Sequence, residues 1–215
     1  MLTENSTYKE LYSVLREAMS IDLYRNKRFK GQRERAMLNG EDWMHFFAKI
    51  KGECVMYICD LKNKRWRPVI YMDATEGLSF AWFGRNFNVI LLRGHAIARY
   101  IQRKVYHNEN MDVYEDDFFP AAFKVLYEIK TIEQSYDKIG EQLQVFFDDG
   151  AFLCSEQDKV ITLGTYIPLS KMHPNQILAM HKAKKMQDEE RNKVYETNID
   201  MAIKLNEIAC TKRLR

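Results

Sequence analysis

The sequence has little of what breaks up or cross-links a chain. Four prolines and nine glycines among 215 residues are too few for a linker-rich or low-complexity protein. The four cysteines form no CxxC pair, and the spacing of Cys54 and Cys59 fits no common zinc arrangement. We therefore expect free thiols in a reduced cytoplasm, where they act as small hydrophobic core residues.

Long hydrophobic runs and the familiar catalytic motifs are missing as well. No stretch approaches the roughly 20 apolar residues that cross a bilayer, and no basic segment followed by an apolar one opens the chain. The sequence contains no P-loop, GxGxxG loop, GxSxG elbow or HExxH helix, so nucleotide-binding enzymes, serine hydrolases and zinc proteases lack their usual signatures here. We expect no membrane partner, no metal and no cofactor.

Charge is nearly balanced, with 33 basic and 30 acidic residues and a formal net charge of +3. This balance neither requires nor excludes nucleic acid, so an electrostatic argument depends on local clusters. The acidic run at residues 115–117 could hold a metal only with ligands from elsewhere in the chain. Its place before an apolar stretch is explained by the helix dipole, which favours carboxylates at a helix N-terminus.

The chain has ample material for a folded core. Hydrophobic residues make up 46% of it, with twelve phenylalanines and twelve tyrosines, and these values exclude global disorder. A length of 215 residues suits one well-filled domain. We expect one compact domain of the α+β class.

The first fifty residues read as a helical segment. Residues 7–24 have an amphipathic pattern, with Thr7 as N-cap and Glu10 at the reciprocal position of a capping box. Their stripe consists of Leu11, Val14, Leu15, Ala18 and Met19. A basic stretch follows, and residues 41–50 suggest a shorter helix with aromatic residues on one side.

Residues 51–170 then form the predicted core, in which the hydrophobic period changes to that of strands. An antiparallel meander of four strands is predicted at 54–59, 68–72, 79–83 and 87–92. Helices follow at 94–106 and 116–129, and three strands at 143–147, 151–154 and 160–167. The pattern therefore predicts antiparallel β meanders with flanking helices. It leaves open whether the two groups of strands share a sheet.

Residues 171–215 form the predicted C-terminal helix, which runs from about residue 174 to residue 208. Near its end an apolar stripe recurs at spacings of four and three residues: Val194, Asn198, Met201, Leu205 and Ile208. Two heptads are too few to establish a coiled coil. The stripe either docks on the body of the protein or pairs with a protein partner, including a second copy of this chain.

The strongest candidate site is a helix that opens at Gly94. At about 100° per residue, its polar ridge and its apolar face lie on opposite sides. The ridge is His95, Arg99 and Arg103, and the apolar face is Ile97, Ile101 and Val105. Two guanidiniums can hold a phosphodiester and a histidine can move a proton near neutral pH. The alternative is an ordinary solvated helix face, since arginine is a good helix former.

The order of elements around this ridge resembles a known group of proteins. The strand at 88–92 leads into His-Ala-x-x-Arg-Tyr-x-x-Arg, and a later meander ends on a strand that begins Lys159-Val160-Ile161-Thr162-Leu163. Over residues 88–168 this is similar to ribonuclease toxins of the RelE and BrnT type, within the barnase–EndoU–colicin–RelE-like group. The resemblance implies metal-independent RNA cleavage by attack of the 2′-hydroxyl on the adjacent phosphate. It implies acid–base chemistry at His95 and phosphate binding at Arg99 and Arg103.

The last strand of the resemblance adds two candidates. Strict alternation places Thr162, Gly164 and Tyr166 on one face of this strand, so Thr162 and Tyr166 could join the catalytic cleft. The alternative is that both are ordinary strand residues, because threonine and tyrosine have high β-propensity.

Two basic clusters provide candidate nucleic-acid contacts. Phe29 within the first could stack on a base. The first cluster consists of Arg25, Lys27, Arg28, Lys30 and Arg33, and the second of Lys64, Arg65 and Arg67, beside Lys62 and Trp66. A solvated loop and a charged hairpin tip are the respective alternatives. Together with the arginine ridge, the clusters make RNA the best single hypothesis for a partner.

Two functions are compatible with these features. The first is a nucleic-acid-directed protein of the metal-independent endoribonuclease or toxin-like kind. The second is a non-catalytic binding or regulatory accessory protein, of the kind a mobile element or phage encodes, which would use the basic loops and the C-terminal helix.

Overall fold

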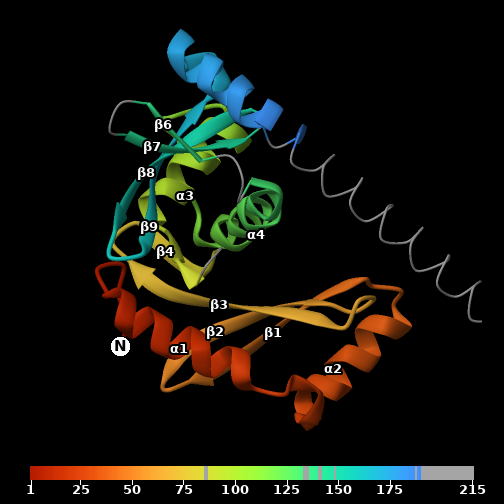
Figure 1. Ribbon diagram of the computed structural model, residues 1–215. Coiled ribbons are helices and arrows are strands. Elements are labelled where there is room, and N and C mark those ends of the chain that lie inside the picture. The colour runs from red at the N-terminus through yellow and green to blue at the C-terminus, as the bar shows by residue number, and fades with distance from the viewer. Residues whose placement is uncertain (85–86, 133–135, 140–141, 148, 187, 190–215) are drawn as a thin grey trace, which may run out of the picture.

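A single nine-stranded sheet organises the protein (Figure 1). The computed structural model describes residues 1–84, 87–132, 136–139, 142–147, 149–186 and 188–189. Strand order in the sheet is β1-β2-β3-β4-β5-β9-β8-β7-β6. The strands are β1 (Trp43–Ile50), β2 (Glu53–Asp60), β3 (Arg65–Ala74), β4 (Gly77–Phe83), β5 (Val89–Leu92), β6 (Tyr136–Ile139), β7 (Gln142–Phe147), β8 (Gly150–Gln157) and β9 (Val160–Pro168).

Helices lie on both faces of the sheet. They are α1 (Tyr8–Ser20), α2 (Lys27–Leu38), α3 (Gly94–Tyr100), a π-helical turn (Ile101–Val105) and α4 (Glu115–Ile132), with single 3₁₀ turns at Leu23–Arg25 and Leu169–Lys171. Residues 174–186 are also helical. None of the helices in the described part of the chain has the length and apolar character to cross a membrane. The predicted α+β class is confirmed.

The predicted start of α1 is confirmed in detail. Thr7 Oγ1 accepts the Glu10 N–H at 3.4 Å, and the Thr7 N–H donates to Glu10 Oε2 at 2.7 Å, which completes a capping box. The buried positions of the helix are Leu11, Val14, Leu15 and Ala18. Met19, which was also expected in this stripe, is 49% exposed. Helix α1 therefore covers one face of the sheet with a four-residue stripe.

The first group of strands contains one strand more than the sequence pattern indicated. The meander β2-β3-β4-β5 is present as predicted, but the expected helix at 41–50 is wrong, because these residues form the edge strand β1. Trp43, Phe46, Phe47 and Ile50 are spaced like one helix face. Pairing with β2 nevertheless sends Phe46 to the α1–α2 core and Phe47 to the opposite face. Residues 1–50 are thus not purely helical.

The two groups of strands share one sheet through a parallel pair. Strand β5 pairs with β9 in register Val89↔Val160 to Leu92↔Leu163, whereas every other pair in the described sheet is antiparallel. The core was predicted to be antiparallel throughout, and this one parallel pair departs from that prediction. The parallel pair places the start of α3, which follows β5, beside the middle of β9.

The opposite face of the sheet holds the main core, under α3 and α4. Helix α3 contributes Ala96, Ile97 and Tyr100, and α4 contributes Ala122 and Val125, all fully buried. The strands β6 to β9 complete the meander, and β6 was not predicted from its sequence. Met180 and Ala183 of the C-terminal helix pack on Phe146 and Ala151. The helix therefore docks there, while the stripe Val194–Ile208 lies outside the described residues.

Two of the cysteines serve as core residues, as expected. Cys59 and Cys154 are 2% and 3% exposed, and burial raises the pKa of each thiol to about 12. We predict that a variant with Cys54→Ser and Cys210→Ser reacts with a thiol reagent at pH 8 only after denaturation, because the reactive thiolate is scarce. Counting reacted thiols by absorbance checks this. Rapid native reaction of both remaining thiols would contradict the burial.

These thiols also make stability dependent on alkaline pH. An unfolded thiol ionises near pH 8.5, well below the pKa of the two folded thiols. A raised folded-state pKa stabilises the fold fully below the unfolded value and loses that contribution as pH rises toward the folded value. The free energy of unfolding should therefore fall between about pH 8.5 and 12.

Candidate functional site

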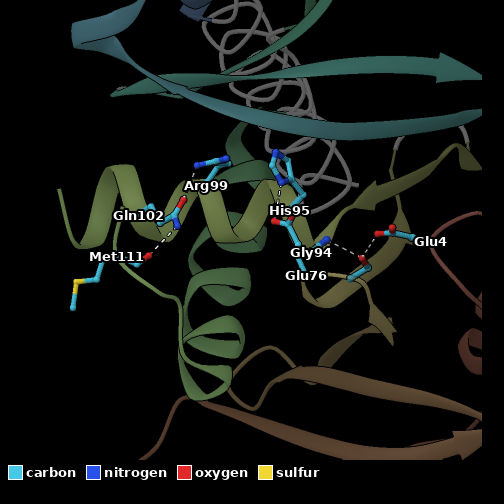
Figure 2. Close-up of polar contacts among 8 residues, drawn as sticks. Glu4, Glu76, Gly94, His95, Arg99, Gln102 and Met111 are labelled. Atoms are coloured by element: carbon cyan, nitrogen blue, oxygen red, sulfur yellow. Dashed lines mark hydrogen bonds and ion pairs between the residues drawn. The ribbon is translucent and has the colours of Figure 1, made fainter. Parts of the chain in front are cut away.

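Helix α3 begins in a tight junction with the turn between β3 and β4 (Figure 2). A Cβ atom at Gly94 would lie 2.3 Å from the carbonyl oxygen of Glu76, so only glycine fits. The Gly94 N–H donates to Ser79 Oγ at 2.8 Å, and Ser79 Oγ donates to Glu4 Oε2 at 3.1 Å. This network fixes the first residue of the helix, and with it the position of His95.

His95 is paired with a carboxylate from the β3–β4 turn. Its Nδ1 lies 2.8 Å from Glu76 Oε2, and the two side chains are 41% and 53% exposed. With Nδ1 engaged by the carboxylate, Nε2 is the ring nitrogen left to contact a ligand. A carboxylate that fixes the orientation of a histidine is the arrangement on which acid–base catalysis depends. No sequence pattern pointed to Glu76, which lies 19 residues before its partner.

Arg99 lies one helical turn beyond His95 and is held in place by its neighbours. Its Nη1 donates to Gln102 Oε1 at 3.1 Å, and Gln102 Nε2 donates to the Met111 carbonyl at 2.9 Å. Figure 2 shows the His95 and Arg99 side chains on the same side of α3. An oriented guanidinium that is partly exposed can bind a phosphate with little rearrangement of its side chain.

Arg103 follows Arg99 by four residues, just as Arg99 follows His95, but the contacts of Arg103 are structural. It donates to the carbonyl of Tyr166, and its Nε lies 3.5 Å from Glu109 Oε1. Glu109 is also bonded by Lys171. That hydrogen bond, with the charges of Arg103, Lys171 and Arg99, lowers the pKa of the Glu109 carboxyl. Arg103 therefore ties the helix to β9, and its charge is already paired.

The π-helical turn explains why the ridge does not continue. The Tyr106 N–H donates to the Ile101 carbonyl at 2.9 Å, a bond across five residues that rotates the later part of the helix relative to α3. Ile97 and Ile101 are buried as predicted, but Val105 is 51% exposed, so its predicted burial is wrong. The prediction for Val105 was based on the period of an uninterrupted α-helix through residue 106, and the π-helical turn changes that period.

Thr162 and Tyr166 lie on opposite faces of the sheet, so their predicted shared cleft is wrong. A β-bulge opposite Leu153 and Cys154 leaves Gly164 without a cross-strand partner and reverses the alternation. Tyr166 is fully buried beneath α3 and donates to Asp149 Oδ1 at 3.0 Å. Thr162 instead lines a cavity beside the N-terminal segment, on the α1 side.

The first basic cluster lies on helix α2 rather than in a loop, except for Arg25, which ends the preceding 3₁₀ turn. Phe29 is 1% exposed in the α1–α2 core, so the expected base-stacking surface is wrong there. The guanidinium of Arg28 lies 5.5 Å from the Phe46 ring centre, and that of Arg33 lies 5.3 Å from the Tyr24 ring centre. Arg25 pairs with Asp22 at 3.2 Å, while Lys27 and Lys30 are exposed.

The second basic cluster lies at the β2–β3 hairpin. Lys64 is exposed in the turn, with Lys62 beside it. Arg65 and Arg67 line a cavity that they share with Trp43 and His45 of β1. The sequence did not indicate these aromatic partners of the cluster, because the spacing of residues 41–50 is that of a helix. The pairing of β1 with β2, and of β2 with β3, places these residues near one another and is known only from the fold.

The surroundings of His95 limit the direction from which an anion can approach. A cavity of about 370 Å³ beside α3 is lined by the carboxylates of Asp73, Glu76, Asp112 and Glu115. Within the described residues, no three histidine, cysteine or acidic side chains are grouped to hold a metal ion. These carboxylates would repel a phosphate from this cavity. Comparisons with known protein families, with curated proteins and with solved structures find no match.

Proposed function

We propose that the protein binds RNA and cleaves it at the exposed pair of His95 and Glu76. The observation that carries this proposal is the 2.8 Å contact between His95 Nδ1 and Glu76 Oε2, with Arg99 one turn away on the same side of α3. A histidine oriented by a carboxylate beside a fixed cation suits proton transfer next to a phosphodiester. The resemblance to RelE-type toxins leads to the same reaction class.

In the proposed step the 2′-hydroxyl of the substrate attacks the adjacent phosphorus. Its proton passes to His95 Nε2 as the new P–O bond forms. The P–O5′ bond then breaks, and the leaving oxygen takes a proton from water, which yields a 2′,3′-cyclic phosphate and a 5′-hydroxyl. The hydroxide that remains takes the proton from the His95 imidazolium, so the histidine returns to its neutral form. Arg99 stabilises the charge that develops on the phosphoryl oxygens. Glu76 stabilises the imidazolium and keeps Nε2 directed at the substrate.

A specific observation also supports the non-catalytic alternative. Arg103 is engaged by Glu109 and Tyr166, so one of the two expected phosphate ligands is not offered. A protein that bound RNA through Arg99 and the β2–β3 hairpin without cleaving it would share this geometry. The two functions differ in whether RNA is consumed.

Labelled single-stranded RNA, incubated with the purified protein in EDTA, separates the two functions. The catalytic proposal predicts shortened products whose 3′ ends carry a cyclic phosphate. RNA that is retained on the protein yet stays intact would favour the non-catalytic function instead.

Arg99 and Arg103 provide a matched pair for the phosphate contact. Arg99→Ala should lower the cleavage rate about tenfold to a hundredfold, because the cation that stabilises the developing charge is removed. Its melting temperature should change little, since Arg99 bonds mainly to Gln102. Arg103→Ala should instead lower the melting temperature, because it breaks the tether to Tyr166 and Glu109. Single-turnover kinetics and thermal melts of both variants test this, and the reverse assignment of effects would contradict it.

A further inference from the structure

A cavity of about 430 Å³ opens between α4 and the outer end of β1, β2 and β3. Its β3 residues lie at the start of that strand, whereas Glu76 follows the end of the strand, and the cavity is on the same face of the sheet as α3 and α4. Phe123 and Leu126 of α4 line one side of it. Its lining is largely apolar, yet it includes two arginines, and this combination is typical of sites for small ligands with an anionic group.

Strand register arranges the floor of the cavity in two rows. Trp43 pairs with Asp60, and Asp60 pairs with Arg65. In the next row on the same face, His45 pairs with Ile58, and Ile58 pairs with Arg67. Since neighbouring strands lie about 4.8 Å apart, the backbones that carry the aromatic side chains on β1 and the arginines on β3 are roughly 10 Å apart. One end of the floor is therefore aromatic and the other cationic.

The aromatic end is already ordered by stacking. The His45 and Phe123 rings lie parallel, with centroids 4.0 Å apart and planes inclined by 14°. Desolvation lowers the pKa of His45, so its ring is mostly neutral at pH 7. The neutral His45 imidazole, the Phe123 ring and the neighbouring Trp43 indole can each stack on a flat heterocycle of any kind.

The cationic end is reinforced by the hairpin. Lys62 and Lys64 are exposed in the turn directly before Arg65. Within the described residues neither Arg65 nor Arg67 forms an ion pair, in contrast to Arg103. Asp60 supports the turn itself, since its carboxylate accepts the Asn63 N–H at 2.9 Å and Asn63 Nδ2 at 2.8 Å. The Asp60 carboxylate also lines the cavity, opposite Arg65, but the two arginines and two lysines outnumber it, so the net local charge is positive beside an aromatic wall.

We infer that this cavity binds one nucleotide, with its base against Trp43 and His45 and its phosphate at Arg65 and Arg67. The base stacks on the aromatic end, and the guanidiniums bind phosphate oxygens at the other. The ligand chemistry is a nucleobase joined to a phosphate, supplied either by a free mononucleotide or by an unpaired residue of a strand.

The position of the cavity adds a second step, which rests on the proposed function. Strand β3 spans ten residues between the cavity and the turn that holds Glu76, roughly 30 Å at about 3.3 Å per residue. A single-stranded RNA that reached both places would be anchored in the cavity and cleaved several nucleotides away. Substrates too short to reach both would then be cleaved more slowly.

Binding of 5′-AMP, measured by calorimetry at low salt, tests the cavity without any cleavage. The inference predicts that AMP binds more tightly than adenosine or inorganic phosphate. Trp43→Ala and Arg67→Gln should each weaken AMP binding about tenfold or more, since stacking and charge-assisted bonds are lost. Trp43→Phe should restore most of the affinity, and Arg16→Gln, at an exposed position of α1 on the other face of the sheet, serves as the matched control.

Several outcomes of this experiment decide the inference. No measurable binding by the folded protein, or equal weakening by Arg16→Gln and Arg67→Gln, would overturn it. A single-stranded oligonucleotide that binds more tightly than AMP identifies a strand as the source of the ligand, whereas equal affinities identify the free nucleotide. His95→Ala should leave AMP binding unchanged, so a failure of the cleavage proposal is distinguishable from a failure of this one.

Discussion

Replacing His95 with alanine should lower the rate of RNA cleavage by about a hundredfold to ten-thousandfold, the usual contribution of a positioned proton-transfer group. The reason is local. Nδ1 is held 2.8 Å from Glu76 Oε2, so Nε2 is the atom available to accept the 2′-hydroxyl proton. The side chain is 41% exposed, so its removal should cost little stability. Single-turnover rates on a labelled RNA, with thermal melts of the same samples, measure both effects.

Two further variants make this test specific. His181→Ala removes an exposed histidine from the helix at 174–186 and should leave the rate unchanged. Glu76→Gln should lower the rate by about tenfold to a hundredfold through loss of orientation, while RNA binding persists. Equal cleavage rates for wild type and His95→Ala would show that His95 takes no part in the reaction.

Replacing Gly94 with alanine should disturb stability and activity together. The added Cβ would lie 2.3 Å from the Glu76 carbonyl oxygen and 3.1 Å from the Ala74 Cβ, so the helix or the turn must move. Such overpacking typically costs about 1–3 kcal/mol, which corresponds to a melting temperature roughly 2–12 °C lower. The same displacement separates His95 from Glu76, and we expect a loss of cleavage approaching that of His95→Ala.

Gly31→Ala provides the matched glycine control. Gly31 lies inside α2, and a Cβ there would meet nothing within 4 Å. Alanine in a helix interior is favoured over glycine by up to about 1 kcal/mol, so this variant should be slightly more stable and fully active. A Gly94→Ala protein with unchanged melting temperature and activity would show that the junction is not as tight as the structure indicates.

Local signals in the sequence predicted those parts of the fold that local interactions determine. The Thr7–Glu10 capping box, the four-strand meander and the helix after Gly94 all have short-range patterns, and the structure confirms them. The errors occurred where tertiary contacts prevail over periodicity. Strand β1 has helical spacing, but its pairing with β2 decides its conformation. The bulge at Gly164 is likewise invisible without the register of β8 and β9.

The candidate site was predicted only in part for the same reason. His95 and Arg99 could be identified because they share a helix face in sequence. Glu76, which gives His95 its orientation, comes from a turn between two other strands. Arg103 matches the helix spacing, but its role depends on Glu109 and Tyr166, which approach it through the tertiary fold. Partners from separate elements carry no periodic signal.

The most direct test of the proposed reaction uses a labelled DNA strand that contains one ribonucleotide. If the 2′-hydroxyl is the nucleophile and His95 accepts its proton, wild-type protein in EDTA should cut only after that ribonucleotide. The product should carry a 2′,3′-cyclic phosphate, and His95→Ala should leave the strand almost intact. Cleavage at deoxynucleotides, products ending in a 3′-hydroxyl, or no cleavage by folded wild-type protein would contradict the proposed reaction.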